Sequence, residues 1–243
     1  MPRIVTASGS GPKQGTPTLP PAGRPFRRRL LAWYARHARR LPWRGVRDPY
    51  AVLVSEIMLQ QTQVARVVEF YPRFLARYPR LEDLSAASAD AVRESWAGLG
   101  YYARARNLHA AARQVVATRG GRLPETEDEL AALPGIGRYT AGAVASLAFG
   151  ADVPAVDTNV ARVLGRVFAV RGPKKSARRA RRLWALAAAL VPPGRASDWN
   201  QALMDLGATI CTARAPRCQT CPVRSCCRGA TRLRQVREVT RSS

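Results

Sequence analysis

The sequence is short of acidic residues and of lysine. Only 16 of its 243 residues are Asp or Glu, whereas 40 are Lys or Arg, so the formal net charge is +24 at pH 7. Three of the basic residues are lysines, and such a bias towards arginine can reflect codon composition rather than a dedicated partner. A folded domain with this much positive charge nevertheless favours a polyanionic partner.

Long apolar runs are also missing. No stretch approaches the roughly 18 uninterrupted apolar residues of a membrane span, and the N-terminus does not follow the pattern of a secretion signal. We therefore expect a protein without membrane insertion or secretion, in the cytoplasm of a bacterial cell and associated with the nucleoid. The hydrophobic fraction of 47% excludes wholesale disorder, and the length suits one large or two small domains.

Strand-like alternation and tandem repeats are absent, so we expect an all-α fold. Apolar residues at helical spacing predict helices over 51–75, 89–96, 103–118, 127–132, 139–149, 160–168 and 176–190. Gly and Pro separate these segments. We expect residues 1–24, rich in Gly, Pro, Ser and Thr, to form a disordered tail, and residues 228–243 to form a basic tail.

A glycine-containing connection between two predicted helices could bind a phosphate. In the segment LPGIGRYTA (133–141), Gly135 and Gly137 let the backbone turn tightly and approach a ligand. The helix that follows presents free N–H groups and the positive end of its dipole, and Arg138 can add a charged contact. An ordinary helix–helix connection would also explain the two glycines. The longer pattern resembles the helix-hairpin-helix element of DNA repair glycosylases.

Four of the five cysteines are closely spaced, as Cys211-x6-Cys218-x2-Cys221-x5-Cys227. Inside a cell this favours a metal site over disulfides, and four thiolates suit zinc or a [4Fe-4S] cluster. Zinc sites usually pair two short Cys-x2–4-Cys units, and this spacing has only one. It resembles the iron–sulfur loop of endonuclease III-type glycosylases. Cys226 could replace Cys227 as the fourth ligand, although we assign Cys227.

Two of the scarce carboxylates are candidates for chemistry. Glu56 lies in a largely apolar helical stretch, where burial should raise its pKa. Asp157 precedes a predicted helix and could simply cap it. A reaction that needs both is cleavage of an N-glycosidic bond, in which one carboxylic acid protonates the departing base and an ionised carboxylate stabilises or attacks the cationic sugar. Sequence spacing does not establish that the two residues meet.

Four further segments resemble MutY-type adenine DNA glycosylases. They are PYAVLVSEIMLQQT (49–62), GLGYYARARNL (98–108), VDTNVARVL (156–164) and NQALMDLG (200–207). The resemblance covers about residues 41–227 and implies the two-lobed helix-hairpin-helix glycosylase fold. One lobe would comprise 25–49 and 150–210, a helical-barrel lobe 50–149, and the iron–sulfur loop 211–227.

The resemblance also implies a substrate. Double-stranded DNA with a mismatched or damaged base pair would lie across the cleft between the lobes, and the target nucleotide would be flipped out of the stack. We expect the protein to act as a monomer. The family usually continues into a C-terminal domain that helps to recognise 8-oxoguanine, whereas this sequence has only a short basic segment after Cys227. It is therefore expected to be a natural short form, a truncated product or a relative with another substrate.

Roles for single residues follow from the resemblance. Glu56 would protonate the adenine and Asp157 would stabilise the oxocarbenium ion, with Tyr139 and Asn159 beside them. Bifunctional relatives carry a Schiff-base lysine where Tyr139 stands, so a monofunctional glycosylase that leaves an abasic site is implied. The other matches would line the base pocket (Trp43, Arg44, Gln201), wedge into the duplex (Leu59, Gln61, Tyr101) and bind the cluster (Cys211, Cys218, Cys221, Cys227).

Three functions remain open at this point. The first is release of adenine opposite 8-oxoguanine or guanine, which the segments 60–62 and 200–201 favour. The second is a thymine/uracil mismatch DNA glycosylase, because the shape of the pocket decides which base is released. The third is a non-catalytic iron–sulfur DNA-binding protein, which the presence of both Glu56 and Asp157 disfavours.

Overall fold

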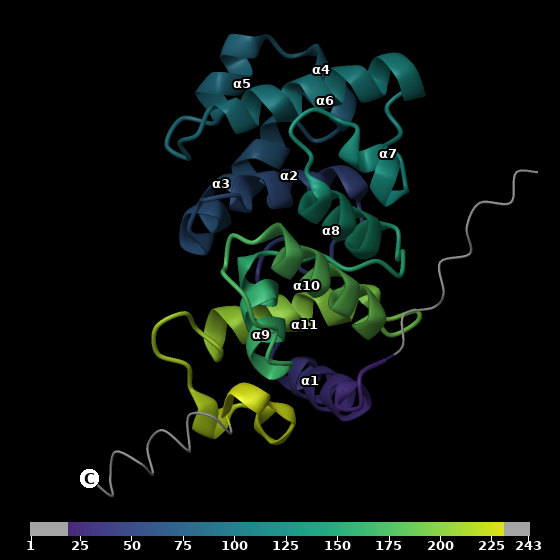
Figure 1. Cartoon of the computed structure of the whole chain (residues 1–243). Coiled ribbons are helices and arrows are strands. Elements are labelled where there is room, and N and C mark those ends of the chain that lie inside the picture. Colours follow the sequence, from purple (N-terminus) through teal and green to yellow (C-terminus); the bar gives the residue numbers. More distant parts are fainter. Residues whose placement is uncertain (1–18, 231–243) are drawn as a thin grey trace, which may run out of the picture.

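The computed structural model describes residues 19–230, and the regular elements in this range are all helices (Figure 1). They are α1 (Gly23–His37), α2 (Pro49–Leu59), α3 (Val64–Arg77), α4 (Leu81–Ala86), α5 (Ala89–Ser95), α6 (Ala103–Arg119), α7 (Glu127–Ala131), α8 (Arg138–Ala148), α9 (Thr158–Val167), α10 (Ala177–Leu190) and α11 (Ala196–Thr209), followed by the 3-10 turns η1 (Cys218–Thr220) and η2 (Arg224–Cys226). The expected all-α class is confirmed for the described residues. None of these helices is long and apolar enough to cross a membrane.

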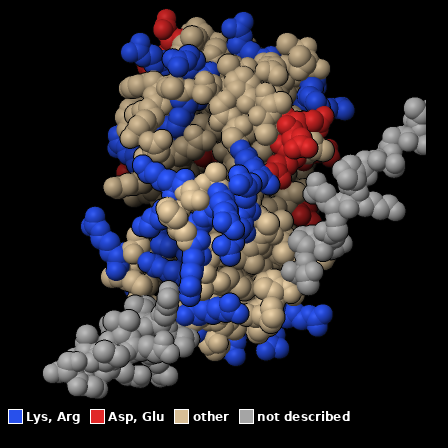
Figure 2. All heavy atoms as spheres, viewed as in Figure 1, with Lys and Arg blue, Asp and Glu red and all other residues tan. Residues whose placement is uncertain are grey.

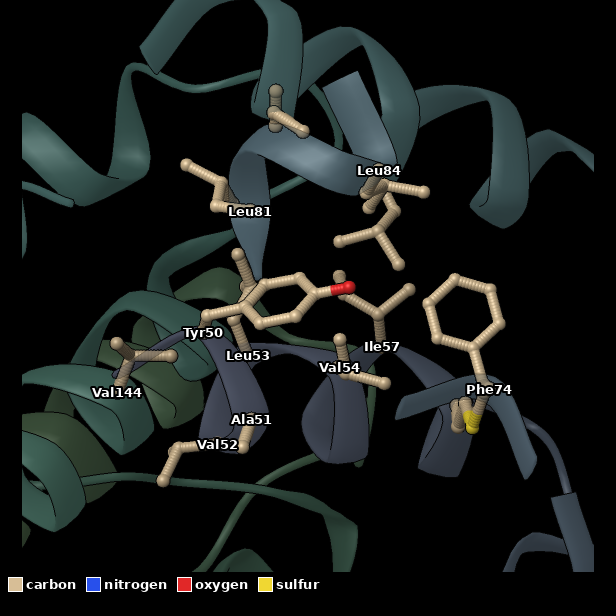
Figure 3. Packing of buried hydrophobic residues seen from close by; sticks show 14 of the residues in the cluster. Tyr50, Ala51, Val52, Leu53, Val54, Ile57, Phe74, Leu81, Leu84 and Val144 are labelled. Atoms are coloured by element: carbon tan, nitrogen blue, oxygen red, sulfur yellow. The ribbon is translucent and has the colours of Figure 1, made fainter. Parts of the chain in front are cut away.

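The first hydrophobic core surrounds α2. Every residue of this helix from Tyr50 to Met58 is buried, and the helix contacts α3, α6 and α8. Figure 3 shows its Ile57 side chain facing Leu84 and Phe74. A helix buried on all sides has no solvent-facing polar stripe. The single carboxylate that α2 carries, Glu56, is therefore buried with the rest of the helix.

The second core brings together α1, α9, α10 and α11. The rings of Phe26 and Trp199 meet edge-on with their centroids 5.4 Å apart, and both side chains are fully buried. The described part of the chain starts in this core with α1, passes through the first core over α2–α8 and then returns (Figure 1). Helix α8 contributes to both cores, with Val144 in the first and Ala143 in the second. It therefore couples the two.

The structure corrects one predicted helix. The segment 51–75 forms two helices, because α2 ends at Leu59 and α3 begins at Val64. Apolar spacing continues on both sides of the break, so periodicity alone does not reveal it. The carbonyl groups at the end of α2 are bound by the guanidinium of Arg104, and Gln61 adopts a left-handed backbone with φ +59°.

The two expected tails lie mostly outside the described residues. Of the segment 1–24, the structure describes only 19–24. Here α1 already begins at Gly23, and Leu19 packs against the second core. Of the basic tail 228–243, only 228–230 are described.

Candidate active site

A cleft of about 1070 Å³ is lined by residues of both cores. Most of the predicted site residues line it: Trp43, Arg44, Glu56, Leu59, Gln61, Gly137, Tyr139, Asp157, Asn159 and Gln201. Tyr101, Gly135 and Arg138 do not. The volume lies just above the usual range of about 300–1,000 Å³ for pockets that hold a small ligand.

Glu56 is the buried acid of the cleft. Its side chain is 4% exposed, and its Oε2 accepts a hydrogen bond of 2.7 Å from the Tyr139 hydroxyl. Burial raises the pKa of Glu56 from 4.5 to about 6, although the Tyr139 bond and the charge of Arg44 oppose the change. The charge of Asp157 raises the pKa further. The fold thus brings Glu56 and Asp157 close enough to interact.

Asp157 both caps a helix and faces the cleft. Its Oδ1 accepts 2.6 Å from the backbone N–H of Val160 in the first turn of α9, and its Oδ2 accepts 2.8 Å from Nδ2 of Asn159. Burial raises the pKa of Asp157, while the two hydrogen bonds lower it. Helix capping and a place in the site are therefore not alternatives for this residue.

Tyr139 and Asn159 orient the two carboxyl groups. Burial and the charges of Glu56 and Asp157 raise the pKa of Tyr139 well above its ordinary value, so its hydroxyl remains a hydrogen-bond donor. The Oδ1 of Asn159 accepts 2.6 Å from Nη2 of Arg162, which directs Nδ2 of Asn159 towards Asp157. Arg162 also binds the carbonyl groups of Gly207 and Cys211, at 2.8 Å each. It thereby connects the site with α11 and the cysteine loop.

A buried ion-pair network forms another wall of the cleft. Asp205 is fully buried, and its Oδ1 accepts from Arg44 at 2.7 Å and from Arg39 at 2.8 Å. Arg44 also donates to the amide oxygen of Gln201 and to the hydroxyl of Tyr34. Sequence reasoning missed Asp205, Arg39 and Tyr34. The scarcity of acids, which pointed to Glu56, applied equally to Asp205.

Asn200 and Trp43 are mainly structural neighbours of the cleft. Buried Asn200 accepts 3.1 Å from the backbone N–H of Ala155 and donates to Ser146 and Val153, so it holds the segment that leads to Asp157 against α8. Trp43 is 8% exposed and meets the ring of Tyr71 edge-on at 5.6 Å. Only a small part of this indole can therefore contact a ligand.

The glycine-containing hairpin lies at the N-terminus of α8. Gly135 has φ +74°, and a Cβ at this position would lie 2.5 Å from the Cβ of Asn107. Gly137 is the N-cap of α8 and lines the cleft, with no atom within 4 Å of where a Cβ would stand. Arg138 instead stacks over the ring of Trp184 at 4.0 Å and pairs with Glu127.

Leu59, Gln61 and Tyr101 lie where two loops meet. Leu59 ends α2, and Gln61 follows in the loop that lines the cleft. Tyr101 precedes α6, is 60% exposed and has φ +48°. Both Gln61 and Tyr101 thus combine an exposed side chain with a left-handed backbone.

The five cysteines follow α11 and are partly buried, and all but Cys218 pack against the second core. Burial raises the pKa of Cys221 to about 11, with further increases from Cys211, Cys227 and Cys218. These four thiols are therefore near one another. In residues 19–230, no three Cys, His, Asp or Glu side chains are grouped compactly enough to hold a single metal ion.

The positive charge is unevenly distributed on the face shown in Figure 2. Lys and Arg form a band over α9 and α10, and acidic residues gather near α7. The band includes exposed residues of the segment 171–182: Arg171, Lys174, Lys175, Arg178, Arg181 and Arg182. Lys174 and Arg179 also line the cleft, so the basic band and the cleft are continuous.

The sequence of this chain is similar to those of curated DNA glycosylases. The chain is 50% identical over 219 residues to the adenine DNA glycosylase of Homo sapiens, covering 86% of this chain and 40% of the relative. It is 45% identical to the adenine DNA glycosylase of Mycolicibacterium smegmatis (81% and 67% covered) and 40% identical to the thymine-DNA glycosylase of Aeropyrum pernix (83% and 92%). The chain spans about two fifths of the length of the human relative.

The fold is similar to solved structures of related DNA repair proteins, and the sequence matches a family model. A thermostable thymine-DNA glycosylase superposes with a TM-score of 0.81 at 34% identity, covering 87% of this chain and 97% of that one. A non-covalent endonuclease III–DNA complex gives 0.72 at 25% identity, with 87% and 96% covered. Residues 54–189 match the family described as HhH-GPD superfamily base excision DNA repair protein. The chain belongs to this HhH-GPD superfamily.

Proposed function

We propose that this chain is an adenine DNA glycosylase, which hydrolyses the N-glycosidic bond of adenine mispaired with 8-oxoguanine or guanine. The observation that carries the proposal is the pair Glu56 and Asp157 in one cleft, with the pKa of Glu56 raised to about 6. One carboxyl is thereby suited to donate a proton near neutral pH, and the other accepts hydrogen bonds suited to its anionic form.

The residues divide the reaction between them. Protonated Glu56 gives its proton to the adenine, the bond from sugar to base breaks, and its electron pair leaves with the base. Anionic Asp157 stabilises the positive charge on the sugar. A water molecule then adds to the sugar and returns a proton to Glu56. The hydroxyl of Tyr139 orients Oε2 of Glu56, and Asn159 orients Oδ2 of Asp157.

Tyr139 also supports a monofunctional enzyme. Its side chain has no amine, so it forms no Schiff base with the sugar. Because its hydroxyl stays protonated and bonded to Glu56, it is not an available nucleophile either. The product is therefore an abasic site in an uncut strand.

The DNA would lie across the cleft and the basic band. The structural likeness to an endonuclease III–DNA complex supports duplex DNA as the partner. We assign the base pocket to Trp43, Arg44 and Gln201, contacts around the opposite base to Leu59, Gln61 and Tyr101, and phosphate contacts to Gly135, Gly137 and Arg138. Adenine is favoured over thymine because five of the seven adenine DNA glycosylases compared are 44–50% identical to this chain, against 40% for the thymine-DNA glycosylase.

A direct assay tests the activity. Purified protein is incubated with duplexes that carry A, T or U opposite 8-oxoguanine or guanine, and strand cleavage is measured with and without hot alkali. We expect cleavage only after alkali and only for the duplexes with adenine. Release of thymine or uracil but not adenine would support the mismatch-glycosylase alternative, and release of no base would support the non-catalytic one.

We also propose that Cys211, Cys218, Cys221 and Cys227 hold a [4Fe-4S] cluster. Cys211 and Cys218 both raise the pKa of Cys221 and of Cys227, so these four thiols lie near one another, which supports this set. Each iron of a cluster takes its own cysteine, so these thiols need not converge on one ion as they would around zinc. When bound, the cluster would cross-link the loop.

Two serine variants test this assignment. Cys227→Ser should lose iron and the visible absorbance of the cluster, whereas the adjacent control Cys226→Ser should retain both. The opposite result would reassign the fourth ligand. Stoichiometric zinc without iron in the wild-type protein would contradict the cluster itself.

A further inference from the structure

Arg104, near the start of α6, is a buried cation without a carboxylate partner among the described residues. Arg104 is 8% exposed, and burial lowers the pKa of its guanidinium. Its guanidinium instead donates to six oxygen atoms: through Nη1 to the carbonyl groups of Ile57, Met58 and Gln60, and through Nη2 to Oγ1 of Thr62 and the carbonyl groups of Leu99 and Gly100. The bonds through Nη2 measure 2.9–3.1 Å.

These bonds compensate a substantial desolvation cost. A charged group removed from water is stabilised by hydrogen bonds to its donors. Both Nη atoms of Arg104 make such bonds, whereas its buried Nε has no partner among the described residues. The last carbonyl groups of α2, which Nη1 binds, are the negative end of a helix dipole. The rings of Trp96 and Tyr101 lie 5.6 and 5.5 Å from the guanidinium and add cation–π attraction. A single side chain therefore joins the end of α2 to the loop before α6.

The two joined loops carry an unusual backbone. In the described range, Gln61 and Tyr101 are two of three non-glycine residues with a left-handed backbone. Such conformations are strained for residues that carry a side chain and persist only where the surroundings enforce them. Both side chains are exposed, and Gln61 lines the cleft. The bonds of Arg104 to the carbonyls of Gln60 and Gly100 fix the residue that precedes each of them.

We propose that Arg104 is a positioning residue for mispair recognition, whose guanidinium sets the orientation of Gln61 relative to Tyr101 so that both side chains meet the duplex as one unit. The inference rests on the proposed function, because it requires DNA in the cleft. Lysine could not replace Arg104, since one ammonium group lacks the planar array of donors that serves both loops.

Binding selectivity tests the proposal. The variants are Arg104→Lys and Thr62→Val, and the control is Arg106→Lys, an exposed arginine on the same helix. Dissociation constants are measured by fluorescence anisotropy for a duplex with an A·G mispair and for the same duplex with A·T, in an Asp157→Asn background. We expect Arg104→Lys to lower the selectivity ratio about tenfold and Thr62→Val about threefold. Arg106→Lys should leave the ratio unchanged.

A second measurement separates positioning from general stability. Single-turnover base release, measured in variants that keep Asp157, should have the wild-type pH midpoint for both Arg104→Lys and Thr62→Val, because neither residue touches Glu56. If both variants retain the wild-type selectivity ratio within about twofold, even with a reduced active fraction, Arg104 is merely structural and the proposal fails. Should Arg104→Lys not fold, Thr62→Val decides. Failure of the proposed function would appear separately, as a wild-type protein that releases no adenine.

Discussion

Glu56 and Asp157 carry the same functional group in different surroundings. Glu56 lies inside a helix that is buried on all sides and receives one hydrogen bond from a tyrosine hydroxyl. Asp157 stands at the start of a helix, where it accepts a backbone N–H and an amide N–H. Hydrogen bonds of this kind favour an anionic carboxylate. Burial raises the pKa of both carboxyl groups, but the two hydrogen bonds at Asp157 oppose the rise there and favour its anionic form.

The rate of base release should depend on the protonation of Glu56. Its pKa of about 6 means that the acid form becomes scarce at higher pH. Single-turnover rates measured from pH 5.5 to 8.5 should fall about tenfold per pH unit well above the midpoint. Glu56→Gln should be inactive throughout. A rate that stays constant from pH 6 to pH 8 would remove Glu56 from the role of general acid.

The same residue should lower the stability of the fold near neutral pH. A carboxyl group with a raised pKa binds its proton more tightly in the folded state, so stability falls as pH rises from 4.5 to about 6. The cost above this window is about 2 kcal/mol. Glu56→Gln should therefore be more stable than the wild type at pH 8, and this difference in stability should become smaller at pH 4.5. The exposed control Glu125→Gln should show no such trend in thermal unfolding.

Asp157→Asn should separate binding from chemistry. Asparagine caps helices as well as aspartate does, so α9 should remain intact while the negative charge is lost. We expect base release to be abolished and the affinity for a mispaired duplex to be retained. The matched control Asp198→Asn, also in the cleft but paired with Arg195, should remain active. Wild-type turnover by Asp157→Asn would refute the role of Asp157.

Sequence reasoning found the acids of the site but not all of the groups that hold them. Glu56 and Asp157 were recognisable because each acid is rare and lies beside apolar or helix-starting residues. Arg162 and Asp205 act through partners that are distant in the sequence, such as Gly207 and Arg39. Such contacts depend on the tertiary fold, so local patterns do not reveal them.

Among the elements, periodicity predicted long amphipathic helices well and breaks within them poorly. Helices α6, α8 and α10 lie close to their predicted ranges. Helix α11 was not among the predicted helices, because its Asn200 and Asp205 are polar yet fully buried and interrupt the apolar pattern. The break between α2 and α3 was missed because a side chain of α6, Arg104, stabilises it.

The hairpin before α8 offers two glycines with different expected effects. Gly137→Ala meets no atom of the protein, so the fold should keep its stability while a phosphate at the helix N-terminus is obstructed. Gly135→Ala would strain a left-handed backbone and press against Asn107. We therefore expect weaker DNA binding with an unchanged melting temperature for Gly137→Ala, and a lower melting temperature for Gly135→Ala. Unchanged DNA affinity of Gly137→Ala would place the phosphate elsewhere.

At the scale of the whole molecule, the site depends on the return of the chain to its first helix. Glu56 belongs to the first core, and Asp157 leads into α9 of the second. The motifs that resemble the glycosylases are spread over both cores. The resemblance could therefore indicate a cleft between two parts of the molecule. The shape of that cleft could not be predicted, because it depends on how α8 and the ion pairs of Asp205 bring the cores together.

The net charge should act through the basic band beside the cleft rather than uniformly. Lys174→Gln with Lys175→Gln removes two exposed charges of this band. In log–log plots of binding constant against salt, the slope should become shallower by about 0.9 for each phosphate that the variant no longer neutralises. Base release at saturating protein should not change. The control pair Arg28→Gln and Arg29→Gln, exposed on α1 and outside the cleft lining, should keep the wild-type slope. An equal change in slope for both pairs of variants would mean that DNA affinity depends only on the total charge.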